Sequence, residues 1–183
     1  MSSQLTSAAP ADVQRLFFAL WPSESVRQQL ERLCKPLWCN GGGRAVTPEN
    51  LHVTLVFLGA VSAEQRACAE RAADAIQLPR FSLLLDRVGY WQRPRVLWFS
   101  PSEQPEAVVN LANALNAGAR ECGLTTDDRL YQTHLTFMRK VAKRPAELAV
   151  EPLVWEVDSF VLVQSQTFSE GVQYMPLRSW PLL

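Results

Sequence analysis

The sequence has 183 residues, of which 48% are hydrophobic and 20% charged, and its 18 basic and 18 acidic side chains give a formal net charge of zero. This length and composition are typical of a globular protein with one compact domain or two small lobes. Zero net charge excludes a global field that would hold nucleic acid non-specifically, so any anion site must be local. No apolar run is long enough for a membrane span and the N-terminus lacks a signal-peptide core, so we expect a cytoplasmic protein with no membrane partner.

The first half of the chain is expected to alternate strands and helices. Residues 1–14 begin with a run rich in serine and alanine and are predicted to form a flexible tail. Ser23 can cap a helix, the glycines of Asn40–Gly43 require a loop, and Ser62 with Gln65 resembles a capping box. The expected elements are a strand at 15–20, a helix from 23 to about 38, a strand at 51–59 and an alanine-rich helix from 62 to about 76.

The second half is richer in strands. Residues 81–91 and 96–100 are predicted to form a strand pair joined by a turn at 92–95. The stretch Pro105–Gly123 has apolar residues at helical spacing and ends on a glycine, which is a common helix terminator. Then follow a strand at 133–139, a loop with basic residues (Arg139, Lys140, Lys143 and Arg144) and two long strands at about 153–167 and 172–180.

This order of elements predicts an α+β fold and not a parallel doubly wound sheet. Residues 15–92, with two helices between three strands, resemble residues 96–166, with one helix among three strands. Such internal pseudo-symmetry and the hairpin-like C-terminal part favour antiparallel pairing. The glycine-rich fingerprint of a dinucleotide-binding sheet is missing as well. We therefore expect one domain at residues 15–183, without an internal boundary.

The four cysteines do not have the spacing of a disulfide or metal framework. Cys34, Cys68 and Cys122 fall in helical patterns, and the pair Cys34 and Cys39 lacks a second pair of ligands. We expect them to be reduced, partly buried thiols, as is usual in the cytoplasm.

The only two histidines of the protein each begin the same tetrapeptide pattern, His-x-Thr-apolar. The two copies, 82 positions apart, are His52-Val53-Thr54-Leu55 and His134-Leu135-Thr136-Phe137. Because side chains alternate faces along a strand, the imidazole and the hydroxyl of each copy share one face and the apolar side chains take the other. A single histidine in a strand is usually a core residue, but the repetition of the whole pattern indicates a functional pair.

Three kinds of chemistry could use a histidine pair. A metal site is poorly supported, because two histidines without nearby Cys, Asp or Glu ligands do not complete a zinc-type site. A nucleophilic site is also poorly supported, because a Ser–His or Cys–His pair does not require a second His-x-Thr pattern. Two facing imidazoles suit a reaction that needs a base on one side and an acid on the other. We therefore expect neither a metal nor another cofactor.

With these motifs and their flanks, the sequence resembles the 2H phosphoesterase superfamily, and within it the bacterial RNA 2′,3′-cyclic phosphodiesterases, also called 2′-5′ RNA ligases. The similarity runs from Arg15 to Leu182. Besides the two motifs, the matching pieces are RLFFALWP at Arg15–Pro22, RVLWF at Arg95–Phe99, Arg139, and the tail from Leu162. The resemblance implies two pseudo-symmetric lobes that interleave along the chain, each an antiparallel sheet backed by helices. One motif per lobe would line a central cleft.

The resemblance also implies an activity, the hydrolysis of a terminal 2′,3′-cyclic phosphate on RNA to a 2′-phosphomonoester, with 2′-5′ RNA ligation as the reverse chemistry. In that reaction water attacks phosphorus and the 3′ oxygen leaves. His52 would be the proton donor for the leaving oxygen and His134 the proton acceptor for water, although the pseudo-symmetry permits the reverse. Thr54 and Thr136 would bind phosphate oxygens; alternatively they reflect only the β-propensity of threonine.

Phe57 and Arg139 each follow a motif histidine by five positions, where the family contacts the nucleotide. An aromatic ring can stack on a base and a guanidinium can bind phosphate. Strict alternation, however, places both on the face opposite the histidines, so a bulge or a strand end must turn them toward the site. Otherwise they are a core phenylalanine and a solvated arginine. The chain departs from the family pattern at Thr133, where proline is expected, and has Met138 after the second motif.

The partners implied by the resemblance are RNA or oligonucleotide ends with a 2′,3′-cyclic phosphate, with transfer-RNA fragments among the candidates, and the protein is expected to be a monomer. A different class of function stays open, namely a non-catalytic module of the same fold that binds nucleotides or RNA ends. The intact second motif argues against this alternative, because binding alone does not need both imidazoles.

Overall fold

The computed structural model describes residues 13–40, 42–142, 150–169 and 171–183. Most of the predicted tail, residues 1–12, lies outside this part of the chain, as do Lys143 and Arg144 of the predicted basic loop. Gln14 already belongs to the first strand, so strand structure begins one residue earlier than expected.

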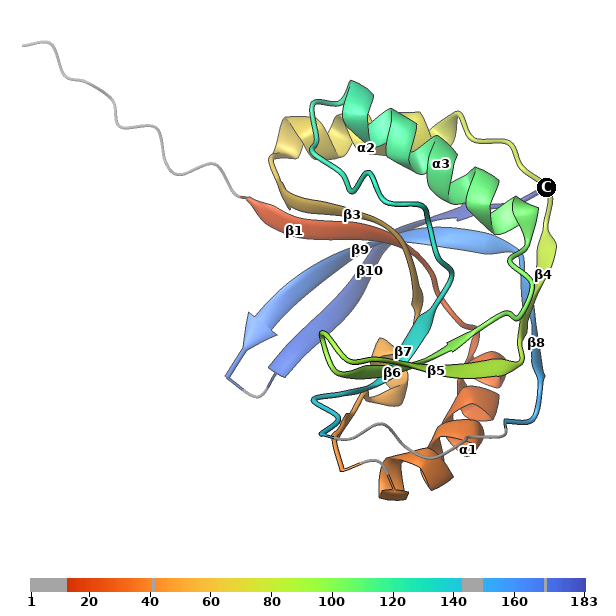
Figure 1. Ribbon diagram of the computed structural model, residues 1–183. Helices are drawn as coiled ribbons and strands as arrows, with labels where there is room; N and C mark the ends of the chain where they lie inside the picture. Colours follow the sequence, from red (N-terminus) through yellow and green to blue (C-terminus); the bar gives the residue numbers. More distant parts are fainter. Residues whose placement is uncertain (1–12, 41, 143–149, 170) are drawn as a thin grey trace, which may run out of the picture.

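Strands and helices alternate at first and give way to strands near the C-terminus (Figure 1). The elements are β1 Gln14–Leu20, α1 Glu24–Asn40, β2 Arg44–Ala45, a 3₁₀ turn Pro48–Asn50, β3 Val53–Val61, α2 Ala63–Asp74, β4 Phe81–Leu85, β5 Arg87–Trp91, β6 Val96–Ser100, α3 Glu106–Glu121, β7 Leu135–Arg139, β8 Leu153–Val157, β9 Ser159–Phe168 and β10 Gly171–Pro181. The capping box expected at the start of α2 is confirmed: the Ser62 hydroxyl accepts from the Gln65 N–H and the Gln65 side chain accepts from the Ser62 N–H.

The strands form a long sheet in the order β10-β9-β1-β3-β7-β6-β5, with β2 beside β7, and the strand pairs among the described residues are antiparallel. Between β3 and β7 the described residues share one ladder pair, Val53 with Leu135. The sheet is therefore divided there into two lobes. In Figure 1, α2 and α3 lie over the β1–β3 lobe and α1 lies beyond the β5–β7 lobe. The predicted α+β fold of two antiparallel lobes backed by helices is confirmed.

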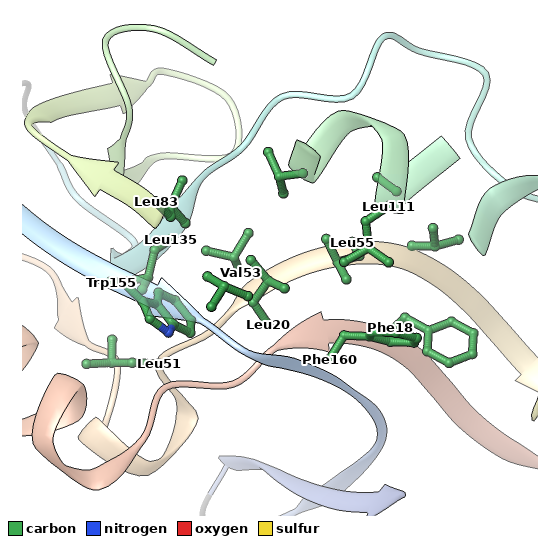
Figure 2. Packing of buried hydrophobic residues seen from close by; sticks show 14 of the residues in the cluster. Phe18, Leu20, Leu51, Val53, Leu55, Leu83, Leu111, Leu135, Trp155 and Phe160 are labelled. Carbon is green, nitrogen blue, oxygen red and sulfur yellow. The ribbon is translucent and has the colours of Figure 1, made fainter. Parts of the chain in front are cut away.

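The main core lies on the helix side of the sheet, where Val53 and Leu135 both point (Figure 2). Strand β1 is buried on both faces: Leu16, Phe18 and Leu20 join the main core, while Phe17 and Ala19 join a second apolar cluster on the other face. Val53 and Leu135 are the first residues of β3 and β7. Because side chains alternate, the residue just before each of them faces the opposite side of the sheet from the main core, which we call the open face.

Two predicted strands are each divided in two. The stretch predicted at 81–91 breaks at Asp86, whose carboxylate accepts hydrogen bonds from the backbone N–H and the hydroxyl of Ser102 at 2.7 and 2.6 Å. The stretch predicted at 153–167 breaks at Asp158. The first halves, β4 and β8, separate from the main sheet and pair with each other, so only β5 forms the predicted hairpin with β6.

The expectation of four reduced thiols is wrong, because Cys68 of α2 and Cys122 at the end of α3 form a disulfide. The two helices pack closely at this point: a Cβ on Gly118 would lie 2.7 Å from the Cβ of Ala72. Each cysteine is four residues from one of these small residues and so lies on the same helix face. Cys34 is a free, buried thiol, and burial raises its pKa to about 12.

None of the helices in the described part of the chain is long and apolar enough to cross a membrane.

Candidate active site

The two motif histidines meet at the junction of the lobes. His52 directly precedes β3 and His134 directly precedes β7, and the next residues, Val53 and Leu135, are the pair that joins the two strands. Both histidines are half-buried on the open face, as the alternation of the motif predicted. The structure thus brings together two side chains that are 82 positions apart in the sequence.

Each imidazole is oriented by a backbone carbonyl two residues before it. His52 Nδ1 lies 2.7 Å from the Asn50 oxygen, and His134 Nδ1 lies 2.8 Å from the Gln132 oxygen. Because a carbonyl can only accept, both Nδ1 atoms carry the proton, and Nε2 is the nitrogen left for chemistry. His52 Nε2 lies 3.0 Å from Thr54 Oγ1, so the imidazole and hydroxyl of this motif are in contact.

Aromatic rings enclose His52 more completely than His134. Trp21 stacks on His52 at a centroid distance of 5.6 Å, Tyr174 meets it edge-on at 5.0 Å, and Phe17 lies at 5.0 Å. The ring of His134 contacts Trp91 at a centroid distance of 4.6 Å. Trp21 and Tyr174 lie in stretches that resemble the family, RLFFALWP and the tail from Leu162, but neither they nor Trp91 were predicted as site residues.

A bulge in β3 turns Phe57 toward the site. Successive residues of β1 pair with Thr54 and Val56, which leaves one extra residue between them. The extra residue reverses the alternation of side chains beyond it. Phe57 is consequently 64% exposed and contacts Phe17 at 5.8 Å, the same ring that contacts His52. Phe57 is therefore not a core residue.

A second bulge at the equivalent place in β7 does the same for Arg139. Successive residues of β6 pair with Thr136 and Met138, so Phe137 is the extra residue. Arg139 is exposed, and its positive charge is close enough to lower the pKa of both motif histidines. In both strands the bulge comes three residues after the histidine, so the pseudo-symmetry extends to this irregularity.

Burial is the main reason why both imidazoles are hard to protonate. Desolvation is the main cause that lowers the pKa of His52 from 6.5 to about 4. The hydrogen bond to the Asn50 carbonyl raises this pKa, and the nearby charges of Arg139 and His134 lower it further. Desolvation also lowers the pKa of His134, again with a contribution from Arg139. In the free protein at neutral pH both imidazoles are therefore uncharged.

This shift makes stability depend on pH. The pKa of such a histidine is lower in the folded state than in the unfolded state. Below pH 6.5 the unfolded chain therefore binds a proton that the folded protein does not, and the free energy of unfolding decreases. For His52 the loss between pH 6.5 and about 4 is on the order of 3 kcal/mol. We expect His52→Gln to lose less stability than the wild type between pH 7.5 and 4.5 in urea unfolding. Equal losses in the two proteins would contradict the buried, neutral imidazole.

A cavity of about 570 Å³ opens beside His134. Its walls come from β3, the β5–β6 turn, α3 and the segment before β7, and the lining residues include Thr54, Phe57, Trp91, Arg93, Arg129, Leu130, Tyr131 and His134. This volume is within the range of small-molecule sites and far above the roughly 30 Å³ share of a water molecule. The aromatic walls suit a base and Arg93 suits a phosphate, whereas Arg129 is paired with the Asp127 carboxylate, which lines the same cavity. Among the described residues, no three His, Cys, Asp or Glu side chains could hold a metal ion together.

Comparison with known proteins agrees with this geometry. The family model described as LigT like phosphoesterase matches residues 20–98. The chain is 33% identical over 174 residues to the RNA 2′,3′-cyclic phosphodiesterase of Escherichia coli (strain K12), covering 94% of this chain and 98% of that protein. It is 32% identical over 174 residues to the enzyme of the same name from Archaeoglobus fulgidus, covering 90% and 98%.

Solved structures give the same result. The crystal structure of E. coli LigT complexed with 3′-AMP matches with a TM-score of 0.86 and 32% identity, over 93% of this chain and 99% of that chain. The crystal structure of a Thermus thermophilus protein, TT0787, matches with a TM-score of 0.77 and 28% identity, over 92% and 97%. With two His-x-Thr motifs at one lobe junction and this similarity along nearly its whole length, the chain belongs to the LigT-like phosphoesterase family of 2H phosphoesterases.

Proposed function

We propose that this protein is an RNA 2′,3′-cyclic phosphodiesterase that hydrolyses a terminal 2′,3′-cyclic phosphate to a 2′-phosphomonoester. The observation that carries the proposal is the meeting of His52 and His134 at the β3–β7 junction, each with Nδ1 bound to a carbonyl, so that Nε2 is the nitrogen for proton transfer. In the free protein Nε2 of His52 contacts the Thr54 hydroxyl, which turns to the phosphate when the substrate binds. The names of the relatives, among them those from E. coli and A. fulgidus, support the same substrate.

In the proposed reaction, His134 Nε2 takes a proton from a water molecule as its oxygen attacks phosphorus in line with O3′. His52 Nε2 gives a proton to O3′ as the P–O3′ bond breaks, so the product has a free 3′-hydroxyl and a 2′-phosphate. His52 has a low pKa in the free protein, but a bound phosphodiester anion beside the ring raises it, because opposite charge favours the protonated form. With the 5′-hydroxyl of another RNA end in place of water, the same steps would form a 2′-5′ linkage.

The remaining motif residues bind the substrate in this proposal. Thr54 and Thr136 donate hydroxyl hydrogen bonds to the non-bridging phosphate oxygens, on which charge develops in the transition state. Arg139 binds the phosphate through its guanidinium. Phe57, exposed at the cavity wall, offers its ring for stacking on the base of the RNA end.

In this proposal the two lobes act together as one catalytic domain. Residues 15–183 act as a single bilobal domain, because one motif comes from each lobe, and a monomer is sufficient. The partners are RNA ends with a cyclic phosphate, including transfer-RNA fragments, and no metal or other cofactor takes part. We place the enzyme in the cytoplasm.

The test is turnover of a nucleoside 2′,3′-cyclic phosphate in excess EDTA. We expect full activity and a 2′-phosphate product, because proton transfer by two imidazoles needs no metal, and phosphorus NMR distinguishes this product from the 3′-phosphate. A large loss of activity restored by zinc or manganese, or a 3′-phosphate product, would contradict the mechanism. Binding of the cyclic nucleotide without turnover would instead indicate a non-catalytic binding module.

A further inference from the structure

Both imidazoles depend on a carbonyl that is not part of a strand. The acceptors for Nδ1 are the oxygens of Asn50 and Gln132, in the segments that lead into β3 and β7. Strand pairing begins only at the residue after each histidine. Something other than the sheet must therefore hold these two carbonyls in place.

Before His134, the side-chain amide of Gln104 performs this role. Gln104 Nε2 donates to the Tyr131 oxygen at 2.7 Å, and Gln104 Oε1 accepts from the Thr133 N–H at 2.9 Å. The amide thus bonds to the residues on both sides of Gln132, much as a neighbouring strand would, and fixes the peptide whose oxygen orients His134. Thr133 is fully buried, so without Gln104 its N–H would lose this acceptor inside the protein.

Before His52, the side-chain amide of Asn50 bonds in the same pattern. Asn50 Nδ2 donates to the Val172 oxygen at 3.0 Å, and Asn50 Oδ1 accepts from the Tyr174 N–H at 3.3 Å. Again the amide bonds to a carbonyl and to the N–H two residues later. These bonds fix Asn50, whose own carbonyl orients His52, to the strand β10 that carries the Tyr174 ring against His52.

We infer that Asn50 and Gln104 are positioning residues, each of which sets the ring orientation and tautomer of one catalytic histidine through a two-point amide clamp. The inference rests on the proposed function for the roles of the histidines, but the clamps themselves are independent of it. A loosened carbonyl lets the imidazole rotate and exchange its proton between Nδ1 and Nε2, so the reactive nitrogen is in the correct form for a smaller fraction of the time.

The variants Asn50→Leu and Gln104→Met remove both bonds of a clamp while keeping similar size. Matched controls are Glu49→Leu and Glu103→Met, which change the exposed neighbours. We expect each clamp variant to lower kcat about ten- to a hundredfold with KM changed less than about threefold, because the geometry of proton transfer is lost and not the substrate contacts. Asn50→Leu should shift only the limb of the pH–rate profile that belongs to His52, and Gln104→Met only the limb of His134. The controls should match the wild type.

Nitrogen-15 NMR of the two imidazoles at pH 7.5 provides a readout that does not require turnover. In the wild type both rings should be in the Nδ1–H form; Gln104→Met should give a tautomer mixture at His134 alone, and Asn50→Leu at His52 alone. Unchanged tautomers in both variants would overturn the inference. The inference would also be overturned if kcat fell only because the variant has a lower Tm, so that kcat returned to the wild-type value at a lower assay temperature. If the wild type hydrolyses no cyclic phosphate, the proposed function fails, while the tautomer experiment still decides the role of the clamps.

Discussion

Replacing either His52 or His134 by alanine should lower turnover of a 2′,3′-cyclic phosphate by about 10²- to 10⁴-fold, the usual contribution of a general acid or base. The double variant should lose little more, because the two imidazoles act in one step and their effects are not additive. Thr54→Ala and Thr136→Ala remove one hydroxyl donor each and leave proton transfer intact, so they should cost less. These four variants and the double variant can be compared in one steady-state assay.

The pH profile gives a second measurement of the same pair. One histidine must be protonated and the other neutral, so the rate should follow a bell-shaped curve. Because burial lowers the pKa of both rings, the optimum of kcat/KM, which reports the free enzyme, should lie below pH 6.5. A bound phosphate anion raises both values, so the optimum of kcat should lie at higher pH. Near wild-type rates in both single alanine variants would refute the two-histidine mechanism.

A substrate with a good leaving group should show which histidine is the acid. A nitrophenyl phosphodiester on O2′ of a 3′-deoxynucleoside releases a phenolate, which needs no proton, and it has no 3′-hydroxyl that could attack internally. On this substrate His52→Ala should recover to within about tenfold of the wild type, whereas His134→Ala should keep its full loss, since water must still be deprotonated. The ratio of the two substrates' rates, measured for each variant, isolates the acid step.

The opposite pattern, recovery in His134→Ala alone, would exchange the two roles, which the pseudo-symmetry of the site permits. Arg139→Ala serves as the control in this comparison. It removes a positive charge near both imidazoles without removing either, so its loss should be similar on the two substrates. Recovery of neither histidine variant would mean that no proton reaches the leaving group from this pair.

The parts of the site that follow simple alternation could be predicted from the sequence. His52 and His134 lie on the open face beside their threonines because a strand has a period of two, and Val53 and Leu135 point into the core for the same reason. The positions of Phe57 and Arg139 could not be predicted, because a β-bulge depends on the register of a neighbouring strand and leaves no mark in the pattern itself.

The amide clamps and the disulfide escaped prediction for a related reason. Gln104 lies 30 residues before His134 in a loop, and nothing in its local sequence indicates the backbone that it contacts. The departure at Thr133 was visible, but not its consequence: unlike proline, threonine has an N–H that needs an acceptor, and Gln104 provides one. Likewise Cys68 and Cys122 look unrelated until the small residues Ala72 and Gly118 bring α2 and α3 together.

The disulfide also changes the length of the covalent path between the two halves of the site. Along the backbone the histidines are separated by 82 residues, but Cys68 follows His52 by only 16 residues and Cys122 precedes His134 by only 12. Loop-closure entropy grows with the logarithm of the separation, so the shorter path makes their encounter in an unfolded chain easier by about 1 kcal/mol. In the unfolded chain with the disulfide formed, the two motifs therefore stay connected by this shorter path before the sheet forms. Without the disulfide, the chain must bring them together across the full backbone separation.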